Sequence, residues 1–278
     1  MIVPALLILS VIPFGENLFL IDINVGLLFL LAVTSITSLG IFMAGWSSGN
    51  RYAMLGSMRG VAQLISYEVP MVLSVVGVLL LAGSMSLADI VEAQRIPFLA
   101  LQPLGFLIFI SAASAELNRS PFDTIEAESE IIAGYHIEYS GMKFGIMQLA
   151  EFAGVVILAA TLSTLFLSGW QGPFLPSPIW FLVKVFFFLF LMIWIRATLP
   201  RLRIDQIMGF AWKVLFPLSI LNIFVTAIEV LLWKNPTLTQ LWAMAAVNWA
   251  IAIVAVLLLS WLMGKKLQKP ARTVIYET

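Results

Sequence analysis

The sequence predicts an all-α polytopic membrane protein, a helical bundle of about seven full transmembrane helices preceded by a partial one. The chain of 278 residues is 61% hydrophobic and only 11% charged, whereas a soluble domain is roughly 25% charged. Its mean hydropathy is +1.03, and several apolar runs reach the roughly 20 residues that cross a bilayer. Because no stretch has the composition of a soluble domain, we expect residues 1–278 to form a single integral membrane domain.

The residues that the chain lacks exclude several kinds of chemistry. Cysteine is absent and there is one histidine. Iron–sulfur clusters need thiolates, a bis-histidine haem needs two imidazoles, and a zinc site of cysteines and histidines cannot form. The net charge of zero gives no basis for nucleic-acid binding. We therefore predict no metal site and no redox centre on this chain, so that any redox centres lie on other chains.

Residues 1–14 are apolar but too short to cross a bilayer. Pro13, Gly15 and Glu16 predict a turn after them. A signal peptide fits poorly, because no basic stretch precedes the apolar run and no small-residue cleavage site follows it. We expect this segment to be the second half of a helix whose first half is missing.

Seven full spans are predicted after this turn. They are Asp22–Gly45, Ile65–Ser84, Phe98–Leu117, Phe144–Ser168, Pro178–Leu199, Phe210–Leu232 and Leu241–Met263.

The distribution of positive charge predicts how the chain is oriented. Of its 15 Lys and Arg residues, Lys184 lies within a span, and only Arg95 and Lys234 lie in the loops after the second, fourth and sixth spans. The other twelve lie on the opposite side or at its boundary. Because positively charged loops remain in the cytoplasm, we expect a multi-pass protein of the cell's inner (plasma) membrane. The loop at 118–143 and the loop at 201–213 would then both face the cytoplasm.

The loop at 118–143 is the one long polar interruption in the sequence. It contains the carboxylates Asp123, Glu126, Glu128, Glu130 and Glu138. A charge run is usually a solvated face, but Asp123 with Glu126 three residues later predicts a capped helix start, and interleaved apolar residues let the segment bury a face. Interacting buried carboxylates have raised pKa values, which is what a proton relay near neutral pH requires.

Five charged residues lie in or near apolar spans: Glu68, Glu116, Glu151, Lys184 and Glu229. A charge at the bilayer centre costs at least about 2.5 kcal/mol, so such residues usually face the bundle interior or a wet cavity. Glu151, about two turns into its span, is the strongest candidate for a buried functional role. The other three acids lie near predicted span ends, where the headgroup layer is an alternative. Lys184 either snorkels or pairs with an acid.

Three stretches resemble the H subunit of NADH:quinone oxidoreductase, respiratory complex I. They are GNRYAMLGSMRGVAQLISYEVP at Gly49–Pro70, AELNRSPFDTIEAESEIIAGYHIEYSGMKFGIMQLAEF at Ala115–Phe152, and WIRATLPRLRIDQIMGFAWKVLFPLSILNIFVTA at Trp194–Ala227. A shared hydropathy profile would not reproduce NRSPFD, EYSGMKF and RATLPR in that order.

The resemblance implies a membrane subunit of a proton-translocating enzyme that transfers electrons from NADH to a quinone such as ubiquinone in a respiratory chain. The quinone would bind where this chain meets the hydrophilic quinone-site subunits, with small membrane subunits as its other neighbours and with FMN and iron–sulfur clusters on other subunits. The implied quinone-chamber and proton-path candidates are Asp123, Glu126, Glu128, Glu130, Glu151 and Glu68. The implied charge-compensating residues are Arg119 and Arg196, with Lys184 as a further candidate.

The sequence departs from the family at its start, because the first transmembrane helix and the amphipathic segment after it are not present. In the family this region lines the quinone entrance, so entry residues are not assigned. The last predicted span would be an extra helix that some members carry. Three alternatives remain open: the homologous subunit of a membrane-bound hydrogenase, a stand-alone ion-coupled secondary transporter, and a structural anchor for peripheral subunits.

Overall fold

The computed structural model describes residues 1–16, 18–119, 121–125, 134–233 and 236–267, with side chains as far as residue 259. The regular elements in this part of the chain are helical. They are α1 (Ile2–Val11), α2 (Gly26–Ser47), α3 (Arg51–Ala82), α4 (Leu87–Ala93), α5 (Phe98–Leu101), α6 (Pro103–Glu116), the 3₁₀ turn η1 (Gly134–His136), α8 (Gly141–Phe166), α9 (Ser177–Thr198), α10 (Ile204–Phe210), the π-helical turn η2 (Ala211–Leu215), α11 (Phe216–Leu232) and α12 (Leu238–Leu267).

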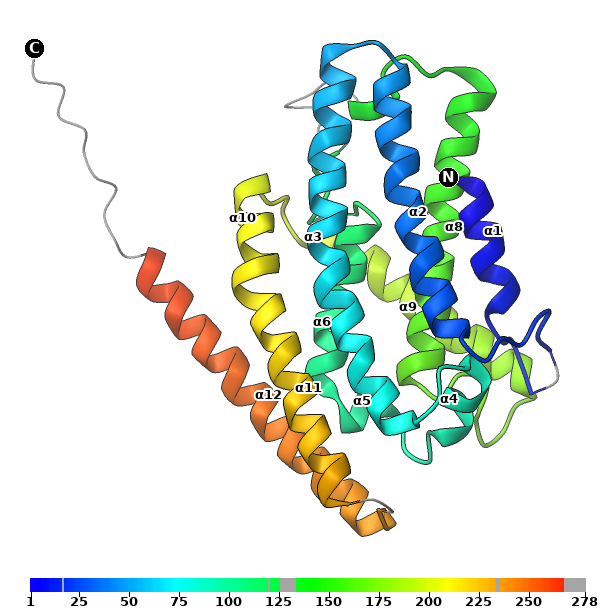
Figure 1. Cartoon of the computed structure of the whole chain (residues 1–278), viewed down its shortest axis with the longest axis vertical. Coiled ribbons are helices and arrows are strands. Elements are labelled where there is room, and N and C mark those ends of the chain that lie inside the picture. Colours follow the sequence, from blue (N-terminus) through cyan, green and yellow to red (C-terminus); the bar gives the residue numbers. More distant parts are fainter. Residues whose placement is uncertain (17, 120, 126–133, 234–235, 268–278) are drawn as a thin grey trace, which may run out of the picture.

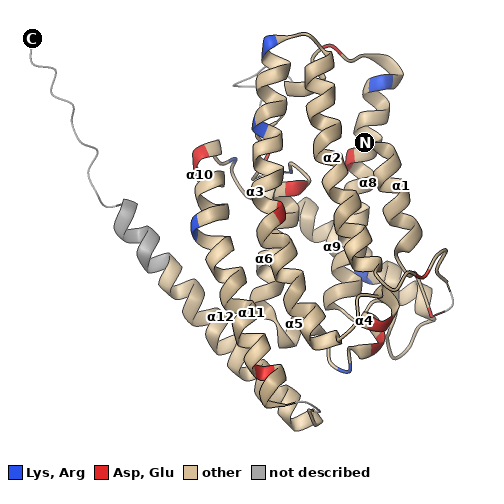
Figure 2. Cartoon of the chain, viewed as in Figure 1, with Lys and Arg blue, Asp and Glu red and all other residues tan. Residues whose placement is uncertain are grey.

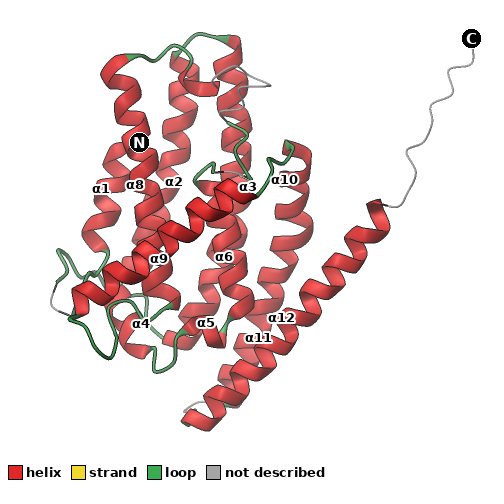
Figure 3. Ribbon diagram, turned by 180° about the vertical axis from the view of Figure 1, so that it is seen from behind, coloured by secondary structure: helices red, strands yellow, loops and turns green. Residues whose placement is uncertain are grey.

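The helices pack around α3, which contacts α2, α6 and α11 along its length. α1 lies against α2 and α8, and α9 crosses the back of the bundle against α8 (Figure 1, Figure 3). α12 packs on α5 and α6 and then diverges from the bundle (Figure 1). α2 ends, and α3 and α8 begin, at the end of the bundle that we call the acidic-loop end. α11 ends and α12 begins at the opposite end.

Six described helices are long and apolar enough to cross a membrane, rather than the seven predicted. The exception is the third predicted span, which divides into α5 and the 14-residue α6 at Gln102. Pro103 has no N–H and disfavours a helical conformation at the residue before it, which explains the break. The boundaries of α2, α8, α9 and α12 agree with the prediction to within a few residues, and the short apolar N-terminal segment forms α1.

α3 begins at Arg51, far before the predicted start of its span at Ile65. The side chain of Asn50 caps this start by accepting a hydrogen bond from the backbone N–H of Tyr52 at 3.0 Å. The first turns contain Arg51 and Arg59, so a hydropathy criterion does not detect them. At 32 residues, the helix is about 48 Å long at 1.5 Å per residue, which exceeds the roughly 30 Å hydrocarbon layer.

The sixth predicted span also begins earlier, because α10, η2 and α11 form one continuous helix from Ile204 to Leu232. Pro217 lies within it and cannot donate to the carbonyl four residues before it. Just before this proline, the N–H of Phe216 donates to the carbonyl of Ala211 five residues earlier. Such single π-turns often mark functional segments of helices.

Charged residues are sparse along the helices and gather toward helix ends and connecting loops, with a few acids inside the bundle near α3 and α6 (Figure 2). Large apolar side chains cover the outer surface, as expected of helices that face lipid. Examples on α9 are Phe186, Phe190 and Ile193, each at least 64% exposed.

Candidate functional site

The beginning of the acidic loop is held against α3 by Gln63, which is fully buried. Its Nε2 donates to the backbone oxygens of Ala115 at 2.8 Å and Phe122 at 2.9 Å. Its Oε1 accepts a hydrogen bond from the hydroxyl of Thr124. One amide therefore satisfies backbone groups on both sides of the turn that leaves α6.

Tyr67, one turn further along α3, connects the same loop to α10. Its hydroxyl donates to the backbone oxygen of Ile207 at 2.9 Å, and its ring centroid lies 5.4 Å from that of Phe122. Phe122 also stacks on Phe210 at 6.5 Å. The three stretches singled out in the sequence thus pack against one another, although they are far apart in the chain.

Three glutamates from three helices lie beneath this loop. Glu68 projects from the middle of α3, Glu116 ends α6, and Glu151 lies on α8. Glu68 accepts a hydrogen bond from the hydroxyl of Ser35 on α2 and lies close enough to Glu116 for the two carboxyls to interact electrostatically. Carboxyl groups from two neighbouring helices are therefore held close together inside the bundle.

Glu151 is the point at which the two described ends of the acidic loop converge. Tyr135 donates its hydroxyl hydrogen to Glu151 Oε1 at 3.1 Å, and the guanidinium of Arg119 lies 3.9 Å from Oε2. Arg119 also lies over the ring of Phe152, 5.0 Å from its centroid. The carboxylate is therefore oriented by one donor and one cation, both of which come from the loop.

A cavity of about 110 Å³ connects Glu116 with Glu151. α1, α2, α6 and α8 supply most of its wall, which is largely apolar. The polar contributions come from the two glutamates, Asn118, Thr34, Thr37 and Thr161. A water molecule occupies roughly 30 Å³ in the liquid, so the cavity has room for several. An apolar chamber with carboxyls at one side suits an amphipathic ligand or a chain of water molecules that moves protons.

The remaining predicted site residues fall into three groups. Asp123 is half-buried in the loop directly before Thr124. Glu126, Glu128 and Glu130 lie outside the described residues, as does most of the helix predicted after Asp123. Arg196 is exposed in the last turn of α9.

Lys184 was predicted to snorkel or to pair with an acid, and its described hydrogen bonds are to backbone carbonyls. Its ammonium donates to the backbone oxygens of Leu167, Gly169 and Gln171 at 2.6, 2.8 and 2.8 Å. These carbonyls follow the last residue of α8, where a helix leaves acceptors unpaired and carries partial negative charge. Lys184 thus stabilises a helix end.

Sequence reasoning missed Gln63, Tyr67 and Tyr135 as parts of this site. A buried glutamine is visible in sequence only as a polar residue among apolar ones, and its carbonyl partners carry no side-chain signal. It also placed Glu68 near the start of its span, whereas Glu68 lies in the middle of the longer α3.

The cavity and the loop above it lie in a part of the chain that matches a known family. The family described as NADH dehydrogenase matches residues 1–227. The chain belongs to this family.

Curated relatives in the NADH dehydrogenase family are named as H subunits of NADH-quinone oxidoreductase. A protein of Dehalococcoides mccartyi is 56% identical over 230 residues, which cover 83% of this chain and 65% of the relative. One from Anoxybacillus flavithermus is 51% identical over 230 residues, covering 81% and 69%. One from Carboxydothermus hydrogenoformans is 48% identical over 237 residues, covering 84% and 67%. The chain thus spans about two thirds of the length of the relatives it matches.

The matched region contains the acidic loop, Gln63, Tyr67 and the three glutamates. It ends within α11, so that α12 lies beyond it. The three sequence stretches that carry the family resemblance all lie inside the match, which confirms the predicted family.

Proposed function

We propose that this chain is a membrane subunit of a proton-translocating NADH–quinone oxidoreductase, in which it forms part of the quinone chamber and of the acidic path that moves protons. The observation that carries the proposal is a series of three glutamates beneath the acidic loop. Glu116 and Glu151 line one largely apolar cavity, and Glu68 lies next to Glu116. The names of the relatives support the reaction, and the helical bundle supports a place in the membrane.

The proposed chemistry divides the work between this chain and its partners. Electrons come from NADH through FMN and iron–sulfur clusters on the hydrophilic subunits, and the quinone binds where those subunits meet this chain. Reducing a quinone to a quinol consumes protons. In this proposal Glu151, held by Tyr135 and Arg119, responds to charge changes in the chamber, and the carboxyls of Glu116 and Glu68 pass the proton toward α2 and α3.

The loop carboxylates extend this path toward the quinone. Asp123 is fixed next to Thr124 and hence to Gln63, so it belongs to the wall of the chamber in this proposal. Glu126, Glu128 and Glu130 remain candidates for the same path. The loop faces the cytoplasm of a plasma-membrane complex, as the distribution of positive charge predicts.

The test is substitution of Glu151→Gln and, separately, Asp123→Asn in the assembled complex. Reduction of an artificial acceptor by the hydrophilic arm should remain unchanged, because that reaction does not reach this chain. Quinone reduction, or the proton pumping that accompanies it, should fall. The matched control is Glu16→Gln, an exposed acid in the loop before α2. Normal quinone reduction and pumping in both site variants of a fully assembled complex would rule out the relay.

Isolation of the tagged chain in mild detergent separates the other candidate functions. Co-purifying hydrophilic subunits with iron–sulfur EPR signals and NADH:quinone activity would support the proposal. Nickel and hydrogen evolution would indicate a membrane-bound hydrogenase. Ion exchange by the chain alone in proteoliposomes would indicate a secondary transporter. A structural anchor predicts that neutralising the buried acids changes assembly but not turnover.

A further inference from the structure

α11 buries a row of polar side chains that the acidic cavity does not use. Ser219, Asn222, Thr226 and Glu229 are 0, 4, 0 and 5% exposed. Their spacing of three, four and three residues places them on one face of the helix. The lipid-side positions are apolar, with Phe224 and Leu231 65% and 73% exposed.

Neighbouring helices add polar groups to this row. Asn248 of α12 donates through Nδ2 to Glu229 Oε2 at 2.8 Å. The amide of Gln102, between α5 and α6, is fully buried. It lies near Asn222, because both amides approach Gly77 of α3. A Cβ added to Gly77 would lie 2.9 Å from Asn222 Nδ2 and 3.0 Å from Gln102 Oε1. We call these six residues the polar seam. Its members are Ser219, Asn222, Thr226, Glu229, Gln102 and Asn248.

Several buried atoms of the polar seam have no hydrogen-bond partner among the described residues. They are both amide atoms of Gln102, Nδ2 of Asn222 and Oε1 of Glu229. In a membrane-spanning bundle such atoms are costly unless water or another group satisfies them. The backbones of Gly77 and Gly105 approach the two amides closely, because a Cβ at either position would lie within 3.4 Å of them. A cluster of unsatisfied donors and acceptors of this kind is where buried water binds.

The polar seam is separate from the cavity beneath the acidic loop. Glu68 and Gly77 are nine residues apart on α3, which at 100° per residue places them on opposite faces of the helix. Glu68 faces Ser35 of α2, whereas Gly77 faces Asn222 and Gln102. Gln63, Tyr67 and the acidic loop likewise contribute no group to the polar seam.

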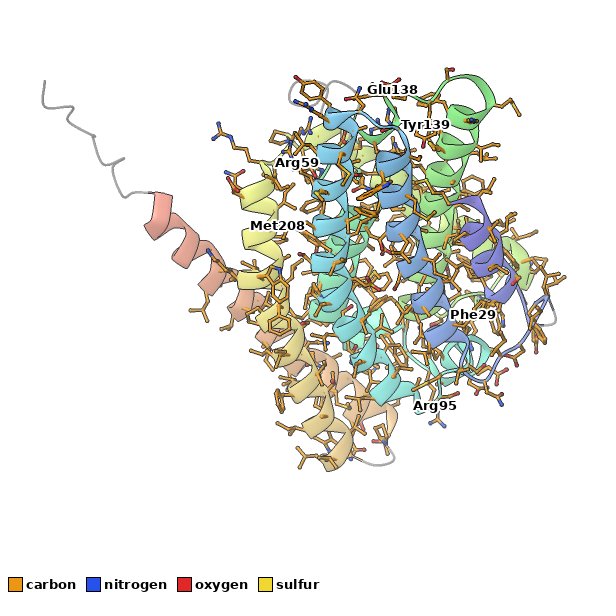
Figure 4. The ribbon with its side chains drawn as sticks, turned by 45° about the horizontal axis from the view of Figure 1, so that its top comes forward. Phe29, Arg59, Arg95, Glu138, Tyr139 and Met208 are labelled. Carbon is orange, nitrogen blue, oxygen red and sulfur yellow. The ribbon has the colours of Figure 1, made fainter. Side chains whose placement is uncertain are left out.

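An open pocket of about 460 Å³ lies near the polar seam, and its wall contains Leu101 and Val230, the chain neighbours of Gln102 and Glu229. Val230 and Trp233 of α11, Met244 of α12 and Arg95 line it. Arg95 lies at the end of the bundle opposite Glu138 and Tyr139 (Figure 4). Arg95 is also the charged residue in the pocket wall. On the elements packed against α11, Glu116 lines the acidic cavity and Glu68 lies next to Glu116. Arg51 and Arg59 lie near the acidic-loop end of α3, and Lys213 of η2 is exposed.

We propose that the polar seam is a hydrated, proton-exchanging site, with Glu229 as a carboxylic acid that exchanges its proton with water entering from the Arg95 pocket. Water continues from Glu229 to Asn222 and Gln102. The exchange is balanced: a proton leaves the carboxyl for a water molecule, and a water molecule returns one. Glu229 and Asn248 lie beyond the residues matched by the family. Because Asn248 belongs to α12, the site depends on this helix.

The first test is infrared difference spectroscopy of the chain with its native partners in lipid nanodiscs, recorded during exchange from H₂O to D₂O at neutral pH. A protonated carboxyl in contact with water should give a carbonyl band that shifts on deuteration. Glu229→Gln should abolish this band. Glu92→Gln, which changes an exposed acid on α4 near the same end of the bundle, should retain it.

Two outcomes would overturn the proposal. A spectrum of Glu229→Gln identical to that of the wild type would mean that Glu229 is ionised or does not contact water. If Glu229→Gln removes the band but the band does not shift in D₂O, the carboxyl of Glu229 is protonated but does not exchange its proton with water.

A second variant keeps the test decisive if Glu229→Gln does not fold. Asn248→Ala removes the donor to Oε2, so the same band should move to higher frequency, and an unmoved band would contradict the assignment.

A water-resolving cryo-EM map of the wild-type complex should also show density between Gln102, Asn222 and Glu229. An empty space there would contradict the proposal. None of these measurements requires quinone activity, so the proposal fails or stands independently of the proposed function.

Discussion

Single buried polar side chains organise this protein by satisfying backbone groups at helix ends. Gln63 binds the carbonyl oxygens of Ala115 and Phe122, and Lys184 binds three carbonyls beyond the end of α8. Within a membrane, a backbone carbonyl that lacks a donor in the protein cannot accept a hydrogen bond from bulk water instead. The Gln63 amide therefore helps to hold the acidic loop, and the Lys184 ammonium holds the segment that follows α8.

Replacing Gln63 with leucine tests this dependence at the scale of one residue. Gln63→Leu preserves the approximate size but leaves two buried carbonyls and the Thr124 hydroxyl without their partner. Removing one partner of a buried hydrogen bond costs about 1–3 kcal/mol, so the free energy of unfolding in detergent should fall by about that amount. The acidic loop should also become more susceptible to limited proteolysis.

The control is Gln148→Leu on α8, a half-buried glutamine with no side-chain hydrogen bond to any described residue. This variant should unfold at the same temperature as the wild type. Equal stability and equal proteolysis of the two variants would show that Gln63 does not hold the loop.

At the scale of helices, close approach between α2 and α3 shapes the acidic-loop end. A Cβ on Gly45 of α2 would lie 2.2 Å from the Ser57 hydroxyl oxygen and 2.8 Å from the backbone oxygen of Ala53. Small residues allow membrane helices to approach this closely. This approach positions the α2–α3 turn beside the loop, where Asn50 donates to Glu138 at 2.9 Å and Tyr139 donates to the Ala44 carbonyl at 2.9 Å.

Gly45→Ala should force these helices apart. Because one of the clashing atoms belongs to the backbone, no side-chain rotation relieves the contact, and overpacking of this kind costs about 1–3 kcal/mol. We expect a lower unfolding temperature and a weaker Tyr139 contact, measured by fluorescence quenching of a probe in the loop.

Gly145→Ala on α8 is the matched control. An added Cβ there meets nothing within 4 Å, so the higher helix propensity of alanine should stabilise the protein by roughly 0.5–1 kcal/mol. Destabilisation by Gly145→Ala of the same size as by Gly45→Ala would contradict the packing explanation.

At the scale of the whole molecule, the bundle has two chemically different ends. The acidic-loop end carries Glu138 and Tyr139, and the opposite end carries Arg95 (Figure 4). The charge asymmetry predicts that the acidic-loop end faces the cytoplasm. The acidic cavity and the polar seam lie on different faces of α3, so the two proposed proton sites have separate access routes.

Single-cysteine labelling tests this orientation, and the absence of cysteine from the chain removes background labelling from it. Ser140→Cys and Arg95→Cys introduce thiols at two exposed positions. A membrane-impermeant maleimide should label Arg95→Cys in intact cells and Ser140→Cys only after the membrane is permeabilised. The reverse pattern would invert the topology.

The sequence by itself determined the fold class, most spans and the family. Hydrophobic runs report the membrane environment directly, because every backbone group in lipid must bond within a helix. The three quoted stretches carry the family resemblance residue by residue. Hydropathy did not show that the third predicted span divides into α5 and α6, and the early starts of α3 and α10 escaped detection because polar residues occupy their first turns.

Only the tertiary structure decided which polar residues meet. Glu68, Glu116 and Glu151 come from three helices, and nothing in their spacing shows that they lie together, whereas Glu229 and Gln102 belong to a different space on the far side of α3. The backbone carbonyls that Lys184 contacts could not be predicted from the sequence either, because no side-chain pattern reveals them. The physical reason is that burial in a membrane bundle is set by how helices rotate against one another, while hydropathy records only that they enter the lipid.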